Sequence, residues 1–198
     1  MLLKRFLLIL LVTILILTSC NGDSEVKILK KLEKTLDECT GYETGAEMKT
    51  IMDGVESIYR FNEKYIKGGK CTLEVLEPEI SKGITIEYED DKIFLKHASI
   101  EQSISLNTVK SLNTELLLGE FFDNLTSIIS IKEEEIDGEK YFAFHYEIFE
   151  KDKYNKQQII WLKKKDFTPL MMNITDENNN PRVIIKYDNF KFIKEKNI

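Results

Sequence analysis

The alternation of apolar and polar residues predicts that most of the chain after residue 40 is β-structure. Ile84, Ile86 and Tyr88 share one face of their segment and polar residues occupy the other, which is the pattern of a half-buried strand. Comparable segments predict strands at 42–52, 55–66, 70–77, 83–89, 92–96, 99–106, 128–136, 140–149, 157–163, 170–175 and 182–193.

Short turns separate many of these segments, among them Asp53-Gly54 and Asp137-Gly138. Consecutive strands joined by two-residue turns pair in antiparallel fashion, so the pattern predicts a meander. Residues 55–62 also fit a helical period. The aromatic and β-branched residues that crowd this segment favour a strand.

Two segments have a helical period instead. In residues 24–40, leucines recur at helical spacing, and Gly41 is placed to form the C-terminal turn. In residues 114–129, the positions 118, 121, 122, 125 and 129 carry Leu, Phe, Phe, Leu and Ile and form a broad apolar face. This second helix either packs on the sheet or plugs a concave surface.

Together these elements predict an α+β fold: a large curved antiparallel sheet of about 10–11 strands, with an N-terminal helix and a second apolar helix packed on it. Residues 159–162 and 183–185 are apolar on both faces. They therefore predict central strands with a layer on each side.

The first twenty residues have the pattern of a secretory signal peptide, because Lys4 and Arg5 precede the largely apolar residues 6–17. A membrane-spanning helix needs roughly 20 apolar residues, so this run is too short for one. Residues 17–20, Leu-Thr-Ser-Cys, resemble the lipobox of bacterial lipoproteins, in which the cysteine carries a diacylglycerol. The resemblance implies lipidation of Cys20; the alternative is an ordinary signal peptide with an incidental cysteine.

These features predict three parts: a signal peptide at 1–19, a lipidated tether at 20–23 and one domain at 24–198. Without the signal peptide 179 residues remain, enough for one domain with a real core. Even an extended tether reaches only about 10 Å. We therefore expect an extracytoplasmic domain held close to a bacterial membrane.

The net charge and the reactive residues limit which classes of partner and of site we expect. Without Lys4 and Arg5 the chain has 26 basic and 34 acidic residues, which disfavours nucleic acid or an anionic lipid surface as a charge-driven partner. The two histidines, His97 and His145, lie far apart in sequence, and the chain contains no G-x-S-x-G motif. We expect no catalytic, metal-binding or cofactor-binding residues.

Cys39 and Cys71 remain once Cys20 is assigned to lipid. In an exported protein they could form a disulfide, but two separated thiols do not establish one. Both occupy periodic apolar positions, so two buried free thiols fit equally well.

The C-terminal third resembles the LolA/LolB lipoprotein-carrier superfamily. Residues 161–170 hold a tryptophan-bearing strand, a turn and a proline that opens the next strand; residues 176–179 form a polar turn; and residues 185–190 include a Tyr-Asp-Asn-Phe sequence. The layout of the N-terminal part is also similar. The resemblance implies the curved half-barrel sheet of that superfamily and, as one function, a fixed carrier of acyl chains or lipoproteins.

Among lipidated members, the chain resembles the GerS family of clostridial spore germination lipoproteins, through the lipobox, the short tether, the LolA-like layout and a composition rich in Lys, Ile and Asn. This resemblance implies a protein without enzymatic activity that binds and activates the N-acetylmuramoyl-L-alanine amidase CwlD. That amidase contributes to the muramic-δ-lactam of the spore cortex, which is degraded at germination. It also implies a location at the outer forespore membrane and assigns any zinc to the partner.

Three hypotheses follow: an anchored amidase activator, a fixed acyl-chain acceptor, and a sensor of envelope stress, for which the sequence offers no specific feature. We also expect a homodimer formed by exchange of the N-terminal helix and first strands between protomers.

Overall fold

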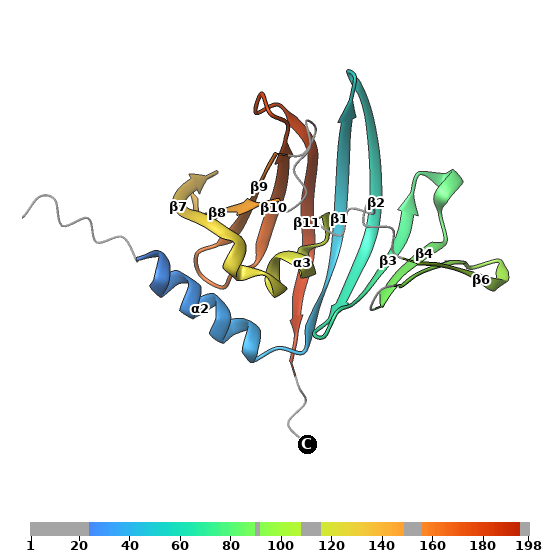
Figure 1. The fold of residues 1–198 in the computed structure, drawn as a ribbon, viewed down its shortest axis with the longest axis horizontal. Coiled ribbons are helices and arrows are strands. Elements are labelled where there is room, and N and C mark those ends of the chain that lie inside the picture. Colours follow the sequence, from blue (N-terminus) through green and yellow to red (C-terminus); the bar gives the residue numbers. More distant parts are fainter. Residues whose placement is uncertain (1–23, 90–91, 108–115, 149–155, 195–198) are drawn as a thin grey trace, which may run out of the picture.

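The computed structural model describes residues 24–89, 92–107, 116–148 and 156–194, and within them eleven antiparallel strands form one curved sheet (Figure 1). The strands are β1 (Gly41–Met52), β2 (Val55–Ile66), β3 (Lys70–Glu77), β4 (Ile84–Glu89), β5 (Lys92–His97), β6 (Ile100–Asn107), β7 (Ile128–Ile136), β8 (Glu139–Glu147), β9 (Gln157–Lys163), β10 (Pro169–Thr175) and β11 (Pro181–Ile193). The helices are α2 (Glu25–Asp37) and α3 (Leu118–Asp123), with short 3-10 turns η1 (Glu79–Ser81) and η3 (Leu125–Ser127). The predicted fold class is confirmed.

The strand order shows how the two halves of the chain meet. The order is β6-β5-β4-β3-β2-β1-β11-β10-β9-β8-β7, so two meanders join where β1 pairs with β11. The chain leaves the sheet at one edge, β6, and re-enters it at the opposite edge, β7. The connection carries α3, which packs against the sheet between these edges (Figure 1).

The face against which α2 and α3 pack is called the inner face here. Its core includes Ile28 and Leu32 of α2, Phe121 of α3, and Phe61 and Phe144 of the sheet. Residues 55–66 form strand β2, as their β-branched and aromatic residues indicate. The turns at Asp53-Gly54 and Asp137-Gly138 have positive φ at both residues, as tight hairpins require.

Three predictions about the helices and layers were wrong in detail. Helix α2 ends at Asp37, and Gly41 begins β1 instead of forming the helical turn. A Cβ atom on Gly41 would lie 2.1 Å from the carbonyl oxygen of Tyr65, so glycine lets β1 approach β2 there. The second helix is also much shorter than residues 114–129, because Ile128 already pairs with Tyr146 in the sheet.

The third correction concerns the outer face of the sheet. Residues 159–162 do lie in an interior strand, and 183–185 in the central β11. Within the described ranges, however, both helices pack on the inner face. The outer face has a smaller cluster made by strand side chains alone, centred on Tyr141, Ala143 and Trp161.

Candidate functional site on the inner face

Helix α3 links the two halves of the sheet through two neighbouring phenylalanines. The ring of Phe121 contacts Phe144 and Tyr146 of β8, with ring centroids 5.6 and 6.0 Å apart. The ring of Phe122 lies 5.7 Å from that of Tyr42 in β1. Burial of one such side chain contributes about 1.5–3 kcal/mol, so these two phenylalanines hold α3 firmly against the sheet.

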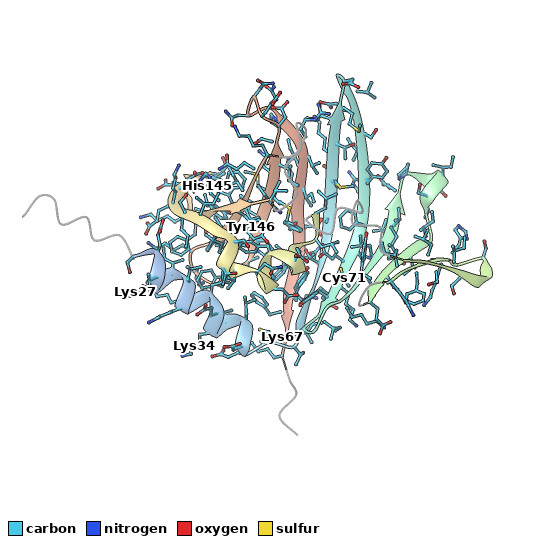
Figure 2. The ribbon with its side chains drawn as sticks, in the orientation of Figure 1. Lys27, Lys34, Lys67, Cys71, His145 and Tyr146 are labelled. Atoms are coloured by element: carbon cyan, nitrogen blue, oxygen red, sulfur yellow. The ribbon has the colours of Figure 1, made fainter. Side chains whose placement is uncertain are left out.

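A buried carboxyl group holds the start of the same helix. Glu63 of β2 is 2% exposed, and it accepts hydrogen bonds from the backbone N–H groups of Leu118 and Gly119. The hydroxyl group of Tyr42 donates to its Oε1 atom at 2.5 Å, and the Cys71 thiol, on the neighbouring strand β3, lies 3.9 Å from the same oxygen (Cys71 is labelled in Figure 2). The carboxyl group thus satisfies backbone donors that have no partner within the helix.

The surroundings of Glu63 change its titration. Burial raises the pKa of its carboxyl group to about 7, although the hydrogen bonds from Tyr42 and from the backbone oppose this shift. Burial and the nearby Glu63 charge also raise the pKa of Tyr42 and of Cys71. The neutral phenol and thiol can therefore act as hydrogen-bond donors at physiological pH.

The other end of α3 is fixed by Tyr65, two residues further along β2. Its hydroxyl group donates to the carboxylate of Asp123 at 2.6 Å. Its ring packs so closely on the helix that a Cβ atom on Gly119 would lie 2.5 Å from it. Side chains of β2 therefore determine where both ends of α3 lie.

Beside α3 lies an apolar cavity of about 330 Å³. It is lined by Met48, Tyr59, Phe61, Leu73, Val75, Ser81, Ile84, Ile86, Tyr88, Leu116, Leu117 and Ile185. Residues of β1, β2, β3, β4 and β11 form one side, and Leu116 and Leu117 before α3 form the other. Its chemistry suits an apolar group, such as an acyl chain or the side chains of a peptide.

The reactive residues singled out in the sequence do not form a common site. His97 ends β5, and its Nδ1 lies 2.8 Å from the Ser99 hydroxyl group. The Nδ1 atom of His145 is hydrogen-bonded to Gln157 in the neighbouring strand β9, and burial lowers its pKa. Among the residues described, no group of three or more His, Cys, Asp and Glu is placed to hold a metal ion.

The structure describes two of the three cysteines. Cys39 and Cys71 are both buried and both free, which decides the question that their spacing left open. Cys20 and the signal peptide lie outside the described residues. Within residues 24–89, 92–107, 116–148 and 156–194, no helix is long and apolar enough to cross a membrane.

Glu63 was not predicted as a site residue, although the strand pattern contained a signal. Phe61, Glu63 and Tyr65 alternate with exposed residues, so a carboxyl group occupies the middle of a buried row. A charged residue at such a position must be paired or neutralised. The helix partners could not be predicted, because they lie more than fifty residues later in the chain.

Comparison with known proteins places the chain in a family. A sequence model described as "Sporulation protein YdcC-like" matches residues 2–197. The chain belongs to this family. The sporulation protein YdcC of Bacillus subtilis (strain 168) is 23% identical over 97% of this chain, which spans 58% of the length of that relative.

Solved structures confirm the fold of this YdcC-like chain. An uncharacterized conserved protein from Thermus thermophilus matches 88% of it and 90% of its own length, with 12% identity and a TM-score of 0.57. The structure of the CwlD amidase from Clostridioides difficile in complex with the GerS lipoprotein matches 88% of this chain and 99% of the compared one, with 23% identity and a TM-score of 0.52. A LolA superfamily protein from Nitrosomonas europaea also matches 88% of this chain and 96% of its own length, with 15% identity and a TM-score of 0.45. The predicted resemblance to GerS and its LolA-like relatives is confirmed.

Proposed function

We propose that this YdcC-like protein is a membrane-anchored, extracytoplasmic binding protein of sporulation that holds and activates an N-acetylmuramoyl-L-alanine amidase. The observation that carries the proposal is the similarity over 99% of a chain from a structure that contains the GerS lipoprotein and the CwlD amidase. Membership of a sporulation family agrees with that setting. By this proposal the chain is not an enzyme, and the partner supplies both the zinc and the hydrolysis.

The hydrogen bonds beside α3 support a binding role. The polar groups buried beside α3 bond to one another: Glu63 to Tyr42 and the helix backbone, and Tyr65 to Asp123. These hydrogen bonds hold α3 on the sheet. What the chain offers a partner is its sheet and the apolar cavity.

The anchor is the second part of the proposal. Residues 1–19 are a signal peptide, Cys20 carries the lipid, residues 20–23 form the tether, and residues 24–198 form one domain. The anchor would hold the activator, and with it the amidase, at the outer forespore membrane. The amidase step would then contribute to muramic-δ-lactam in the cortex and so to germination.

Affinity capture from sporulating cells tests the proposal. The full chain with a C-terminal tag is the bait, and the proteins retained are identified by mass spectrometry. We expect one N-acetylmuramoyl-L-alanine amidase in equimolar amount, and amidase activity that depends on the bait. Recovery of the bait without an amidase would contradict the proposal.

A fixed acceptor of acyl chains is the alternative, and the apolar cavity of about 330 Å³ favours it. The test is binding of a fluorescent fatty acid to the purified protein, with a Leu73→Asp variant as the control for the cavity. Saturable binding that this variant loses would support the acceptor. Absence of binding would remove it.

We also propose the homodimer expected from the sequence, with exchange of α2 and the first strands. In one protomer β1 pairs with both β2 and β11, so an exchanged β1 would replace the same contacts in a second copy. Light scattering at high concentration should give twice the monomer mass. A monomer mass would count against the dimer.

A further inference from the structure

The sheet has a step on one side of β2. Strand β2 pairs with β1 along its whole length, but its pairing with β3 begins only at Arg60, opposite Glu77. After Glu77 the chain turns into η1. Among the residues described, the segment 55–59 therefore has a neighbouring strand on one side only. Figure 1 shows the β1–β2 hairpin rising well beyond β3 and β4.

The backbone along this step presents hydrogen-bonding groups to an absent neighbour. The two-residue turn at Asp53-Gly54 makes Met52 and Val55 the closing hydrogen-bonded pair of the hairpin. Hydrogen-bonded and non-hydrogen-bonded pairs alternate in an antiparallel ladder, so Glu56 and Ile58 direct their N–H and C=O groups away from β1. No other described residue forms a backbone hydrogen bond with them.

At another boundary of the sheet, a charged side chain accepts an outward backbone hydrogen bond. At the edge strand β7, the N–H group of Ile131 donates to the Glu25 side chain at the start of α2, at 2.9 Å. A charged side chain that takes an outward N–H group is one way to protect an edge. The step at β2 has no such cover among the residues described.

Exposed apolar side chains gather around the step. Met52, Val55 and Ile58 lie on the hairpin, and Leu76 and Ile80 lie across from it, with Ile80 92% exposed. These five are more than half of the nine large hydrophobic side chains found exposed in the described ranges. Because side chains alternate between the two faces of a strand, Met52 and Val55 lie on the cavity side of the hairpin and Ile58 on the other side. Exposed apolar side chains therefore border the step on both faces of the sheet, which is typical of a surface that binds a partner.

The apolar cavity lies under the same step. Met48 and Tyr59 of the hairpin line it from one side, and Ser81 and Ile84, which follow β3, line it from the other. Side chains alternate between the two faces of a strand. A strand placed in the step would therefore direct every second side chain toward the cavity.

The charges near the step are mainly acidic. Lys49, Arg60 and Lys82 each form ion pairs with local carboxylates. The carboxylates of the same region are Glu47, Asp53, Glu56, Glu77 and Glu79, and Lys186 of β11 lies opposite Glu47, so one negative charge remains in excess. This imbalance favours a peptide with basic residues beside its apolar ones.

We propose that the step beside residues 55–59 binds one extended strand of a partner protein, with apolar side chains toward the cavity and basic residues outside it. The strand would extend the sheet by pairing with Glu56 and Ile58, in the manner of β-augmentation. Only the identity of the donor rests on the proposed function: in that complex, the strand belongs to the amidase.

Two variants of one residue isolate the backbone contribution. In Ile58→Pro the outward N–H group is lost while the hydrogen bonds to β1 remain, and Ile58→Thr removes the same apolar side chain but retains the N–H group. With the full chain in detergent and the purified amidase, we expect Ile58→Pro to weaken binding at least tenfold relative to Ile58→Thr. Equal affinities for the two variants would overturn the proposal.

A second pair controls for folding. Val55→Asp changes a side chain at the step that is 66% exposed, and Ile129→Asp changes one on the distant β7 that is 60% exposed. Both should keep the thermal midpoint of the parent, and only Val55→Asp should weaken binding. Equal loss in both would count against the site.

A peptide separates this proposal from the proposed function. A synthetic heptapeptide of alternating lysine and valine should slow amide exchange at Glu56 and Ile58. Peptide binding without amidase binding would refute the amidase as the donor of the strand and retain the site. Amidase binding that Ile58→Pro leaves unchanged would refute the site and retain the amidase as a partner. Protection confined to β6, or protection by a second copy of the chain, would overturn the site as proposed.

Discussion

The carboxyl group of Glu63 holds the start of α3 on the inner face. It lies in the core, yet its hydrogen bonds come from the α3 backbone and from Tyr42. Its pKa of about 7 in the folded protein lies above the ordinary value of 4.5. Between these two pH values the folded state binds more protons than the unfolded state, so the stability conferred by this group falls as pH rises.

This linkage gives a prediction for pH dependence. Glu63→Gln retains an acceptor for the helix backbone but cannot ionise. We expect the parent to lose on the order of 3 kcal/mol of unfolding free energy between pH 4.5 and pH 7, since each unit of pKa shift corresponds to about 1.4 kcal/mol. Urea denaturation at a series of pH values should show a markedly smaller slope for Glu63→Gln. Equal slopes for the two proteins would show that Glu63 is not the titrating group.

Gly119 lies directly under the ring of Tyr65. A methyl group there would meet the Tyr65 ring, and Asp123 prevents that ring from moving away easily. Gly119→Ala should therefore destabilise the protein by about 1–3 kcal/mol, the usual cost of overpacking. In a double-mutant cycle with Tyr65→Leu, most of that cost should disappear. Additive effects would mean that the two side chains do not compete for space.

Residue-level features were the hardest to predict from the sequence. The buried state of Cys39 and Cys71 followed from their apolar spacing. The Glu63 cluster did not, because its members come from β1, β2, β3 and α3 and meet only through tertiary structure. Cys20 lies outside the described residues, so its lipidation remains a prediction.

At the scale of elements, the period of the sequence was a reliable guide to the strands and a poor guide to the second helix. The apolar spacing of residues 118–122 continues at Leu125 and Ile129, which made one long helix plausible. The isoleucines at 128, 129 and 131 favour a strand, and pairing with β8 ends the helical segment before Ile128. The exposed side chain of Ile129 shows that its helical spacing was coincidental.

Helix α2 buries one side against the sheet and exposes the other. Leu32 is 0% exposed against the sheet, whereas Val26 on the same helix is 62% exposed. Leu32→Ala should lower the free energy of unfolding by about 2–5 kcal/mol. Val26→Ala should change it by no more than about 0.5 kcal/mol. Chemical denaturation of both variants measures the difference, and similar values would contradict the packing of α2.

For the whole molecule, the meander within each half was predictable from short turns, but the pairing of β1 with β11 was not. Those strands are separated by most of the chain, and no local pattern specifies their contact. The passage from β6 to β7 is a consequence of that pairing. It brings α3 onto the inner face.

The proposed lipid on Cys20 determines where the whole molecule is located. In cells grown with labelled palmitate, the parent should be labelled and recovered with membranes. Cys20→Ala should lose the label and be released without unfolding, whereas the control Cys39→Ala should keep it. A Cys20→Ala protein that stays tightly bound to membranes would contradict the proposed anchor.

We propose that this YdcC-like chain binds and activates an amidase. The most direct measurement is hydrolysis of cortex-type peptidoglycan by the purified cognate amidase, with and without an equimolar amount of the full chain. We predict a stable complex of fixed stoichiometry and activity only when the chain is present. Full activity of the amidase alone, with no complex detectable by light scattering, would contradict the account.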